Sequence, residues 1–191
     1  RPSPTEAAHV AEDLSGKIAM IIDGGPVGIG IESTIIDLTE DTPMVLRPGY
    51  ITPQMLSKVL GKEVIIDPGI IAADDTRKPK APGMKYKHYA PKADMAIVDG
   101  TRKHVIAKIN ELVASHRDDG KKIAVIATEE TKQFYDADVV LSMGSRADED
   151  SIAHELYRIL RDCDELDVDV IFSESFSTPR IGPVSYTHLR A

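Results

Sequence analysis

Strand-like apolar runs alternate with helix-like segments from residue 95 to residue 175, and this alternation restricts the fold more than any other feature of the sequence. A chain that passes from strand to helix to strand returns to the same sheet in the same direction. We therefore expect an α/β fold whose sheet is mostly parallel and covered by helices. The strand-like runs are residues 95–99, 122–128, 137–144 and 168–175, and the helix-like segments are residues 102–116, 129–135 and 148–166.

The first third of the chain combines short strands with two short helices. Ser3 is a good N-cap for a helix over residues 3–17, and Glu6 completes a capping box with it. Thr52, followed by proline, starts the second helix in a similar way. The expected strands are residues 17–23, 33–38, 44–47 and 63–66.

A glycine-rich run, GGPVGIGIEST, occupies residues 24–34 between two of these strands. It lacks the following helix that a dinucleotide-binding fingerprint requires, so we exclude that motif. Its glycines favour a loop with positive φ angles, and they also allow a ligand to approach the backbone closely. The hydroxyls of Ser33 and Thr34 either cap their own loop or bind a carboxylate or phosphate.

Arg47 ends an apolar strand directly before Pro48-Gly49. A guanidinium at the end of a strand suits bidentate binding of phosphate or carboxylate. An isolated arginine is also typical of a surface ion pair. Sequence position alone leaves both interpretations open.

A basic, aromatic strip interrupts an otherwise acidic chain. Residues 1–76 hold 5 basic and 12 acidic residues, residues 77–92 hold 6 basic and no acidic residues, and residues 93–191 hold 12 basic and 19 acidic residues. The net charge of −8 argues against broad nucleic-acid affinity. The strip is compatible with RNA contact, with a solvated linker, or with a cover over a site that holds an anion. Its Tyr86 and Tyr89 favour the cover, because a plain linker does not need aromatic rings.

Composition restricts the class of protein further. Cys163 is the single cysteine, which excludes an internal disulfide. We interpret it as a packing residue. A single cysteine also fits a reducing, cytoplasmic compartment. The six histidines show no metal-ligand spacing. No apolar run approaches the ~20 residues that a membrane span needs, so we expect no membrane association. The opening RPSPT, without Met, is typical of a fragment.

Four segments together resemble the two-domain L-threonylcarbamoyladenylate synthases. They are RPSPTEAAHV, IIDGGPVGIGIESTIIDL, MVLRPGYIT and APGMKYKHYAPKA, in this order. The resemblance implies the C-terminal part of a YrdC-like α/β catalytic domain over residues 1–66 and an interdomain linker over 67–92. It further implies a small Rossmann-like accessory domain over residues 93–182. Residues 183–191 depart from the family pattern, and we expect an atypical tail there.

The resemblance also implies an activity. Such enzymes condense L-threonine, bicarbonate and ATP into threonylcarbamoyl-AMP and pyrophosphate, with Mg²⁺, and the product feeds threonylcarbamoyladenosine formation in tRNA. By correspondence with the family motifs, Ser3 and Arg47 bind ATP, as does Tyr86 or Tyr89 of the linker. Ser33 and Thr34 bind L-threonine. No catalytic residue and no metal ligand is assigned.

Two other functions remain to be weighed. An RNA-binding module of YrdC-like fold would use the basic strip for weak tRNA contact, against which the acidic flanks weigh. A carbamoyl-transfer protein shares the YrdC-like domain but lacks this linker and this C-terminal domain. The family's long N-terminal portion is absent from the sequence, so we expect the chain alone to be inactive. In the cell, its partners would be downstream tRNA-modification proteins.

Overall fold

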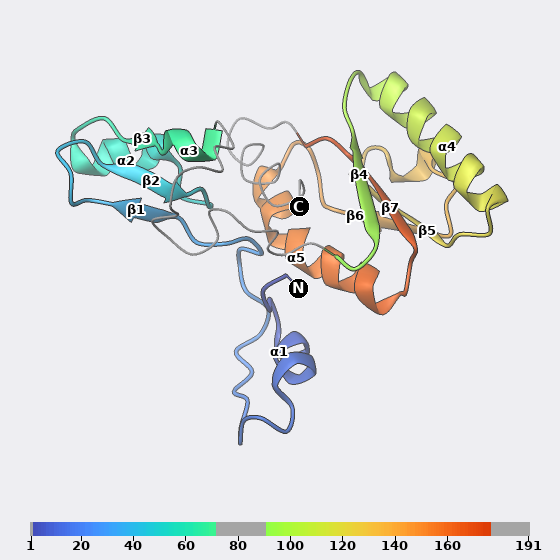
Figure 1. Ribbon diagram of the computed structural model, residues 1–191, viewed down its shortest axis with the longest axis horizontal. Coiled ribbons are helices and arrows are strands. Elements are labelled where there is room, and N and C mark those ends of the chain that lie inside the picture. The colour runs from blue at the N-terminus through green and yellow to red at the C-terminus, as the bar shows by residue number, and fades with distance from the viewer. Residues whose placement is uncertain (1, 72–90, 177–191) are drawn as a thin grey trace.

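The computed structural model describes residues 2–71 and 91–176, and these residues form two separate β-sheets (Figure 1). The first sheet lies with α2 and α3 at one end of the molecule, and the second lies with α4 at the other. Helix α5 lies between them in this view. In chain order the elements are α1 (Ala7–Leu14), β1 (Ile35–Asp37), β2 (Met44–Arg47), α2 (Pro53–Leu60), β3 (Ile65–Ile66), α3 (Pro68–Ile71), β4 (Asp94–Val98), α4 (Arg102–Asp118), β5 (Ile123–Ala127), η1 (Lys132–Phe134), β6 (Val139–Ser142), α5 (Glu149–Glu165) and β7 (Val170–Glu174).

The second sheet has the order β4-β7-β5-β6, and its neighbouring strands all run parallel. Successive side chains of a strand point to opposite faces. Accordingly, Ile123 and Val125 of β5 pack in the cluster that contains α4, whereas Ala124 and Ile126 pack in the cluster that contains α5. The two helices therefore cover opposite faces, which confirms the predicted α/β fold with its mostly parallel sheet.

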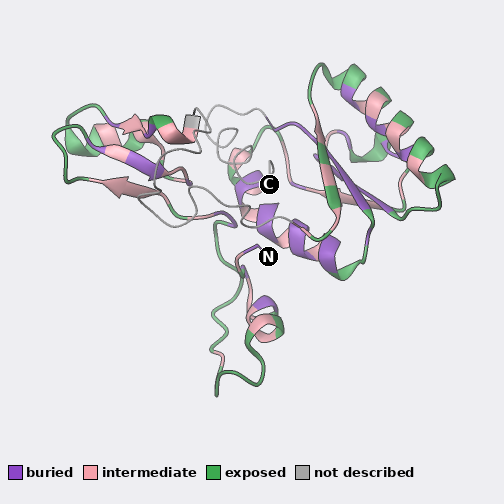
Figure 2. Ribbon diagram, viewed as in Figure 1, coloured by how far each residue is buried: buried purple, intermediate pink, exposed green. Residues whose placement is uncertain are grey.

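Helix α5 is the most extensively buried helix of the described chain (Figure 2). Its N-cap, Asp148, accepts a hydrogen bond from the backbone of Asp150, and acidic residues fill the first turn, where the helix dipole favours them. Cys163 lies on the buried face. Burial raises the pKa of its thiol to about 12, so Cys163 is a packing residue, as predicted.

The first sheet has the order β1-β2-β3, with β1 antiparallel and β3 parallel to β2. Helix α2 begins as predicted: Thr52 accepts a hydrogen bond from Met55 N, and Pro53 occupies the first turn. It ends at Gly61, whose φ of 67° lies in the left-handed region that a helix terminator needs.

The predicted strand over residues 17–23 is wrong. Its residues make no strand pairing with any other described residue, and the side chains of Met20 and Ile22 are 76% and 88% exposed. An apolar strand requires a neighbour to bond its backbone and cover its side chains, and the described residues provide none.

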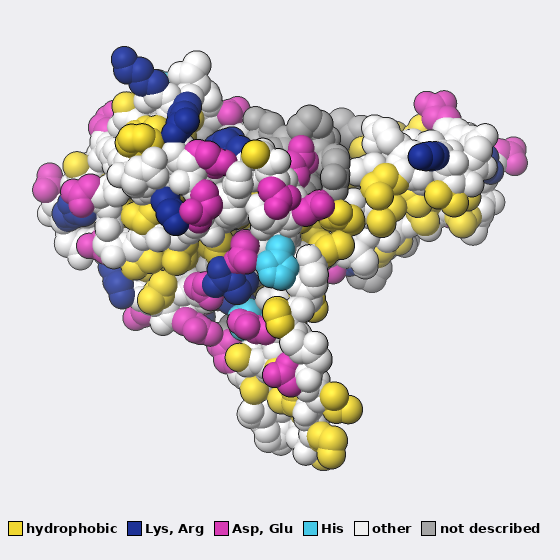
Figure 3. Space-filling view, turned by 180° about the vertical axis from the view of Figure 1, so that it is seen from behind, with side chains coloured by type: hydrophobic (Ala, Val, Ile, Leu, Met, Phe, Trp, Pro, Cys, Tyr) yellow, Lys and Arg dark blue, Asp and Glu magenta, His cyan; other side chains and the backbone are white. Residues whose placement is uncertain are grey.

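Exposed apolar side chains also follow the outer surface of the first sheet and α2 (Figure 3). None of the helices in the described ranges is long and apolar enough to cross a bilayer.

The first helix also begins later than predicted. Ser3 does not cap it; α1 starts at Ala7 with Glu6 in the N-cap position, and no side chain caps that end. The hydroxyl of Ser3 donates instead to the carboxylate of Glu32, which is 29 residues away in sequence. A hydrogen bond to a carboxylate is typically stronger than one between neutral groups, so the bond to Glu32 competes with the predicted cap.

Arg161 of α5 joins the N-terminal residues to the second sheet. Its side chain is only 2% exposed, and its Nη2 lies 2.5 Å from a carboxylate oxygen of Asp13 at the end of α1. Its Nε donates to the carbonyl of Pro2 at 2.9 Å, and Glu12 lies 3.3 Å from Nη1. A buried guanidinium needs such partners because desolvation of an unpaired charge is costly.

We expect Leu156→Ala to lower the free energy of unfolding by about 2–5 kcal/mol, because Leu156 is fully buried in the α5 cluster and its removal leaves a cavity. Chemical denaturation measures this change. Leu38→Ala is the matched control, since Leu38 is exposed and its truncation should cost less than about 0.5 kcal/mol. Equal losses in the two variants would contradict the assignment of the core to α5.

Candidate functional site around Arg47

Arg47, the last residue of β2, is bonded to the segment that follows the glycine-rich loop. Its Nε donates to the carbonyl of Ser33 at 3.0 Å, and its Nη2 donates to Ser33 Oγ at 2.9 Å. Nη2 also lies 3.5 Å from Glu32 Oε2. Because β2 is the central strand of the first sheet, the guanidinium is held at the end of a rigid element.

Glu32 links the two ends of the site. Its Oε1 accepts the hydrogen bond from Ser3 Oγ at 2.5 Å, while its Oε2 faces Arg47. The side chains of Glu32 and Arg47 are each 14% exposed, so the ion pair is largely shielded from water. Ser3, Glu32, Ser33 and Arg47 therefore form one connected cluster.

Gly49 packs closely against the backbone of this cluster. A Cβ atom at Gly49 would lie 2.4 Å from the carbonyl oxygen of Glu32 and 2.5 Å from the backbone nitrogen of Thr34. These distances are too short for any side chain, so glycine is required for close contact between the two backbones. Thr34, on the far side of Ser33, donates its hydroxyl to the carbonyl of Ile51 at 2.8 Å.

The structure brings three of the predicted site residues together: Arg47 bonds Ser33 directly, and Ser3 is connected to Arg47 through Glu32, with Thr34 adjacent. Tyr86 and Tyr89 lie outside the described residues. Sequence reasoning missed Glu32 as the link between Ser3 and Arg47, although a carboxylate next to two hydroxyls in a glycine-rich run was a usable signal. It also assigned Gly49 no role beyond its place in the Pro48-Gly49 pair that follows the strand.

The cluster presents donors that suit an anionic group. Ser33 is exposed, and among the described residues Nη1 of Arg47 has no hydrogen-bond or ion-pair partner. A guanidinium fixed on one edge by Ser33 and Glu32 retains its other edge for a carboxylate or phosphate. Within the described ranges, no three His, Cys, Asp or Glu residues are grouped so that they could hold a metal ion.

A second polar cluster lies at the carboxyl ends of β4 and β7, beside a cavity of about 170 Å³. Buried Glu174 accepts from Tyr135 Oη at 2.6 Å and from Arg146 Nη2 at 2.7 Å. Burial and the neighbouring carboxylate raise the pKa of Tyr135, so this hydroxyl remains a donor. Because each charged group here already has an opposite charge or a hydrogen-bond partner, we assign this cluster to the stability of the second sheet.

Comparison with known proteins relates both sheets to one family. Residues 51–184 match the family model described as threonylcarbamoyl-AMP synthase, C-terminal domain, and residues 1–49 match a model described as telomere recombination. Curated threonylcarbamoyl-AMP synthases of Bacillus subtilis and Pyrococcus abyssi are 44% and 46% identical to the chain, over 95% and 100% of its length. The chain covers 51% and 54% of these relatives, so it spans about half their length.

A solved structure extends the similarity to three dimensions. The crystal structure of P. abyssi Sua5 complexed with L-threonine matches with a TM-score of 0.87 at 44% identity. The match covers 100% of this chain and 54% of that chain. Because it spans the whole chain, the relative placement of the two sheets is included in the match.

We expect the Glu32–Arg47 pair to contribute a coupling energy of about 1–2 kcal/mol to folding, because both side chains are largely shielded from water. A double-mutant cycle with Glu32→Ala and Arg47→Ala, followed by denaturant unfolding, measures it. The control cycle uses Lys108 and Glu111, an exposed pair 2.8 Å apart for which we expect less than about 0.5 kcal/mol. A coupling at Glu32–Arg47 no larger than that of the control would contradict the shielding argument.

Proposed function

The chain belongs to the threonylcarbamoyl-AMP synthase family, and we propose that it is the C-terminal half of an enzyme that condenses L-threonine, bicarbonate and ATP into threonylcarbamoyl-AMP and pyrophosphate. The observation that carries this proposal is the connected cluster of Ser3, Glu32, Ser33 and Arg47. Its support is that the chain matches, over its full length, a relative whose crystal structure is complexed with L-threonine.

We assign the residues of the cluster to two substrates. Ser33 and Thr34 would bind L-threonine, and Ser3 and Arg47 would bind ATP. The exposed position of Ser33 and the Nη1 edge of Arg47, which has no hydrogen-bond partner among the described residues, support this division, because they offer donors on neighbouring sides of one site. Tyr86 and Tyr89 remain proposed nucleotide contacts and lie outside the described residues.

The chemistry that this site must assist is displacement at phosphorus. The amine of L-threonine and bicarbonate form a carbamate with loss of one water molecule. An oxygen of this carbamate then attacks the α-phosphorus of ATP; the new O–P bond forms as the bond to pyrophosphate breaks. Negative charge then increases on the leaving phosphates, and a fixed guanidinium such as Arg47 stabilises it without reorganisation. We assign no general base and no covalent nucleophile.

Mg²⁺ is the expected metal because it accompanies ATP. The described residues do not provide a grouped set of ligands for it, and Glu32, the carboxylate of the cluster, is already bonded to Ser3 and Arg47. Mg²⁺ is commonly held by substrate phosphates and few protein carboxylates. We therefore derive no step through the metal from these residues.

The product is a mixed anhydride of a carbamate with AMP, which water hydrolyses readily. It must be consumed by a carbamoyl-transfer reaction, and we propose that tRNA-modification proteins use it to form threonylcarbamoyladenosine in the cytoplasm. Within the chain, residues 1–66 would belong to the catalytic domain and residues 67–92 to the linker. Residues 93–182 would form the accessory domain, followed by the tail over 183–191.

The proposed function is tested in the full-length enzyme by Arg47→Ala. We expect pyrophosphate release that requires both L-threonine and bicarbonate, and a loss of turnover of about a hundredfold in the variant, because a positioned donor to a developing charge contributes about 3 kcal/mol. Arg117→Ala is the matched control, since Arg117 pairs with Asp136 on the surface of the second sheet.

Other outcomes would decide for other functions. Unchanged pyrophosphate release by Arg47→Ala would remove Arg47 from its assigned role. Release that does not respond to L-threonine would favour a carbamoyl-transfer protein. A salt-dependent shift with tRNA, without any pyrophosphate release, would favour an RNA-binding module.

A further inference from the structure

Gly30 is bonded into the backbone of helix α5. Its N–H donates to the carbonyl of Ala153 at 2.8 Å, and its own carbonyl accepts from the N–H of Tyr157 at 3.2 Å. Ala153 and Tyr157 are four residues apart, so these two groups are the acceptor and the donor of one step in the hydrogen-bond ladder of an α-helix. A residue of the glycine-rich loop thus bridges one turn of a helix that belongs to the other sheet.

Only glycine fits at this place. A Cβ atom at position 30 would lie 2.0 Å from the carbonyl oxygen of His154, which is helix backbone and cannot move aside. The requirement is for space, because Gly30 does not have a left-handed φ. Gly28, two residues earlier, has no atom within 4 Å of its position for a Cβ.

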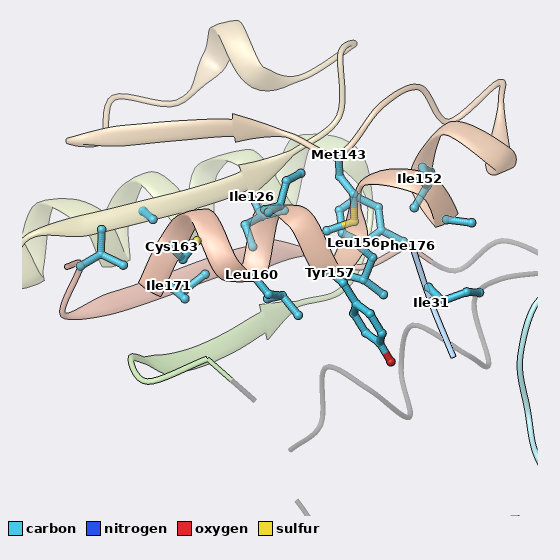
Figure 4. Close-up of a cluster of buried hydrophobic side chains, with 14 residues drawn as sticks. Ile31, Ile126, Met143, Ile152, Leu156, Tyr157, Leu160, Cys163, Ile171 and Phe176 are labelled. Atoms are coloured by element: carbon cyan, nitrogen blue, oxygen red, sulfur yellow. The ribbon is translucent and has the colours of Figure 1, made fainter. Parts of the chain in front are cut away.

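The next residue, Ile31, fixes the loop a second time. Its side chain is 9% exposed and belongs to the buried cluster of α5. Figure 4 shows it beside Tyr157 and Phe176. Backbone bonds at Gly30 and side-chain burial at Ile31 therefore restrain both the position of the loop along α5 and its distance from the helix.

The residues that follow are those of the candidate site. Ser33 lies three residues after Gly30, a reach of at most about 10 Å even for extended chain. Tyr50, the residue after Gly49, also contacts α5, since its hydroxyl donates to the carboxylate of Asp150 at 3.0 Å. Strand pairing within the first sheet places Arg47 opposite Ile35, two residues after Ser33, so β1 and β2 hold the far end of this segment and Gly30 holds its near end.

We propose that α5 is a positioning element of the substrate site: through the Gly30 insertion it sets where Ser33 stands relative to Arg47. The accessory domain then completes the L-threonine side of the site, while the nucleotide side depends more on β2. The identity of the two ligands rests on the proposed function, whereas the geometric coupling of Gly30 to the Ser33–Arg47 contact does not.

The coupling is tested first in the chain of this sequence, without substrate. In Gly30→Ala, we expect the NMR resonance of the Arg47 Nε–H to shift and to lose protection from exchange, because this group donates to Ser33. Gly28→Ala, in the same loop, should leave the resonance unchanged. An unchanged Arg47 resonance in a folded Gly30→Ala chain would overturn the proposal.

The second test uses the full-length enzyme. We expect Gly30→Ala to raise the KM for L-threonine about tenfold and the KM for ATP less than about threefold, with Gly28→Ala close to wild type. A purely structural role predicts an equal loss for both substrates, together with a lower melting temperature, and that result would overturn the proposal. If pyrophosphate release by the wild-type enzyme does not respond to L-threonine, only the proposed function is refuted. The positioning proposal still stands on the NMR experiment, which requires no activity.

A milder variant covers the case in which Gly30→Ala does not fold. Ile31→Val removes one methylene from the buried cluster and leaves the backbone bonds of Gly30 in place. We expect a smaller change in the same direction, with the KM for L-threonine raised about two- to threefold and the KM for ATP unchanged. A larger effect on ATP than on L-threonine would overturn the proposal.

Discussion

Burial of helix α5 on several sides is the constraint on which the rest of the structure depends. One face of the helix covers the second sheet, and Arg161 on another face binds the carboxylate of Asp13 and the carbonyl of Pro2. The backbone near Ala153 receives Gly30. Because the Arg161 side chain is only 2% exposed, loss of its carboxylate partners would leave a buried charge unpaired, which typically costs several kcal/mol. Placement of the N-terminal residues therefore follows from α5 rather than from the elements next to them in sequence.

Local pattern predicted the second sheet well because its strands and helices each bury a periodic face. The run IAVIA of β5 is buried throughout, as parallel strands covered on both faces must be. The same reasoning failed for residues 17–23, which have the right composition but no strand beside them among the described residues. It also failed at Ser3, where a partner 29 residues away displaced a local cap. In both cases the missing information concerned which distant group lies close by.

For the site, as for the fold, the sequence indicated which residue types are present but not which of them lie close together. Hydroxyls at Ser33 and Thr34 and a guanidinium at Arg47 were recognisable as groups that bind anions, but their connection through Glu32 depends on how β2 meets the loop. The glycine-rich run had two interpretations, positive φ angles or close approach. The structure contains both, since Gly25 has a φ of 86° and Gly30 admits a neighbouring helix. The group that approaches Gly30 is protein backbone, which sequence spacing could not predict.

The bond between Gly30 and α5 also means that units which are separate along the chain are not separate in space. Counted along the chain, the two sheets are joined by residues 67–93, between β3 and β4. In space, contacts between described residues also hold the N-terminal part of the chain to α5: Gly30 and Ile31 against α5, Tyr50 against Asp150, and Arg161 against Asp13. A protease that cut the connecting segment would thus break the covalent link and leave the two pieces associated. Recombination between relatives that exchanges one half of the protein must keep both surfaces of this contact from the same parent.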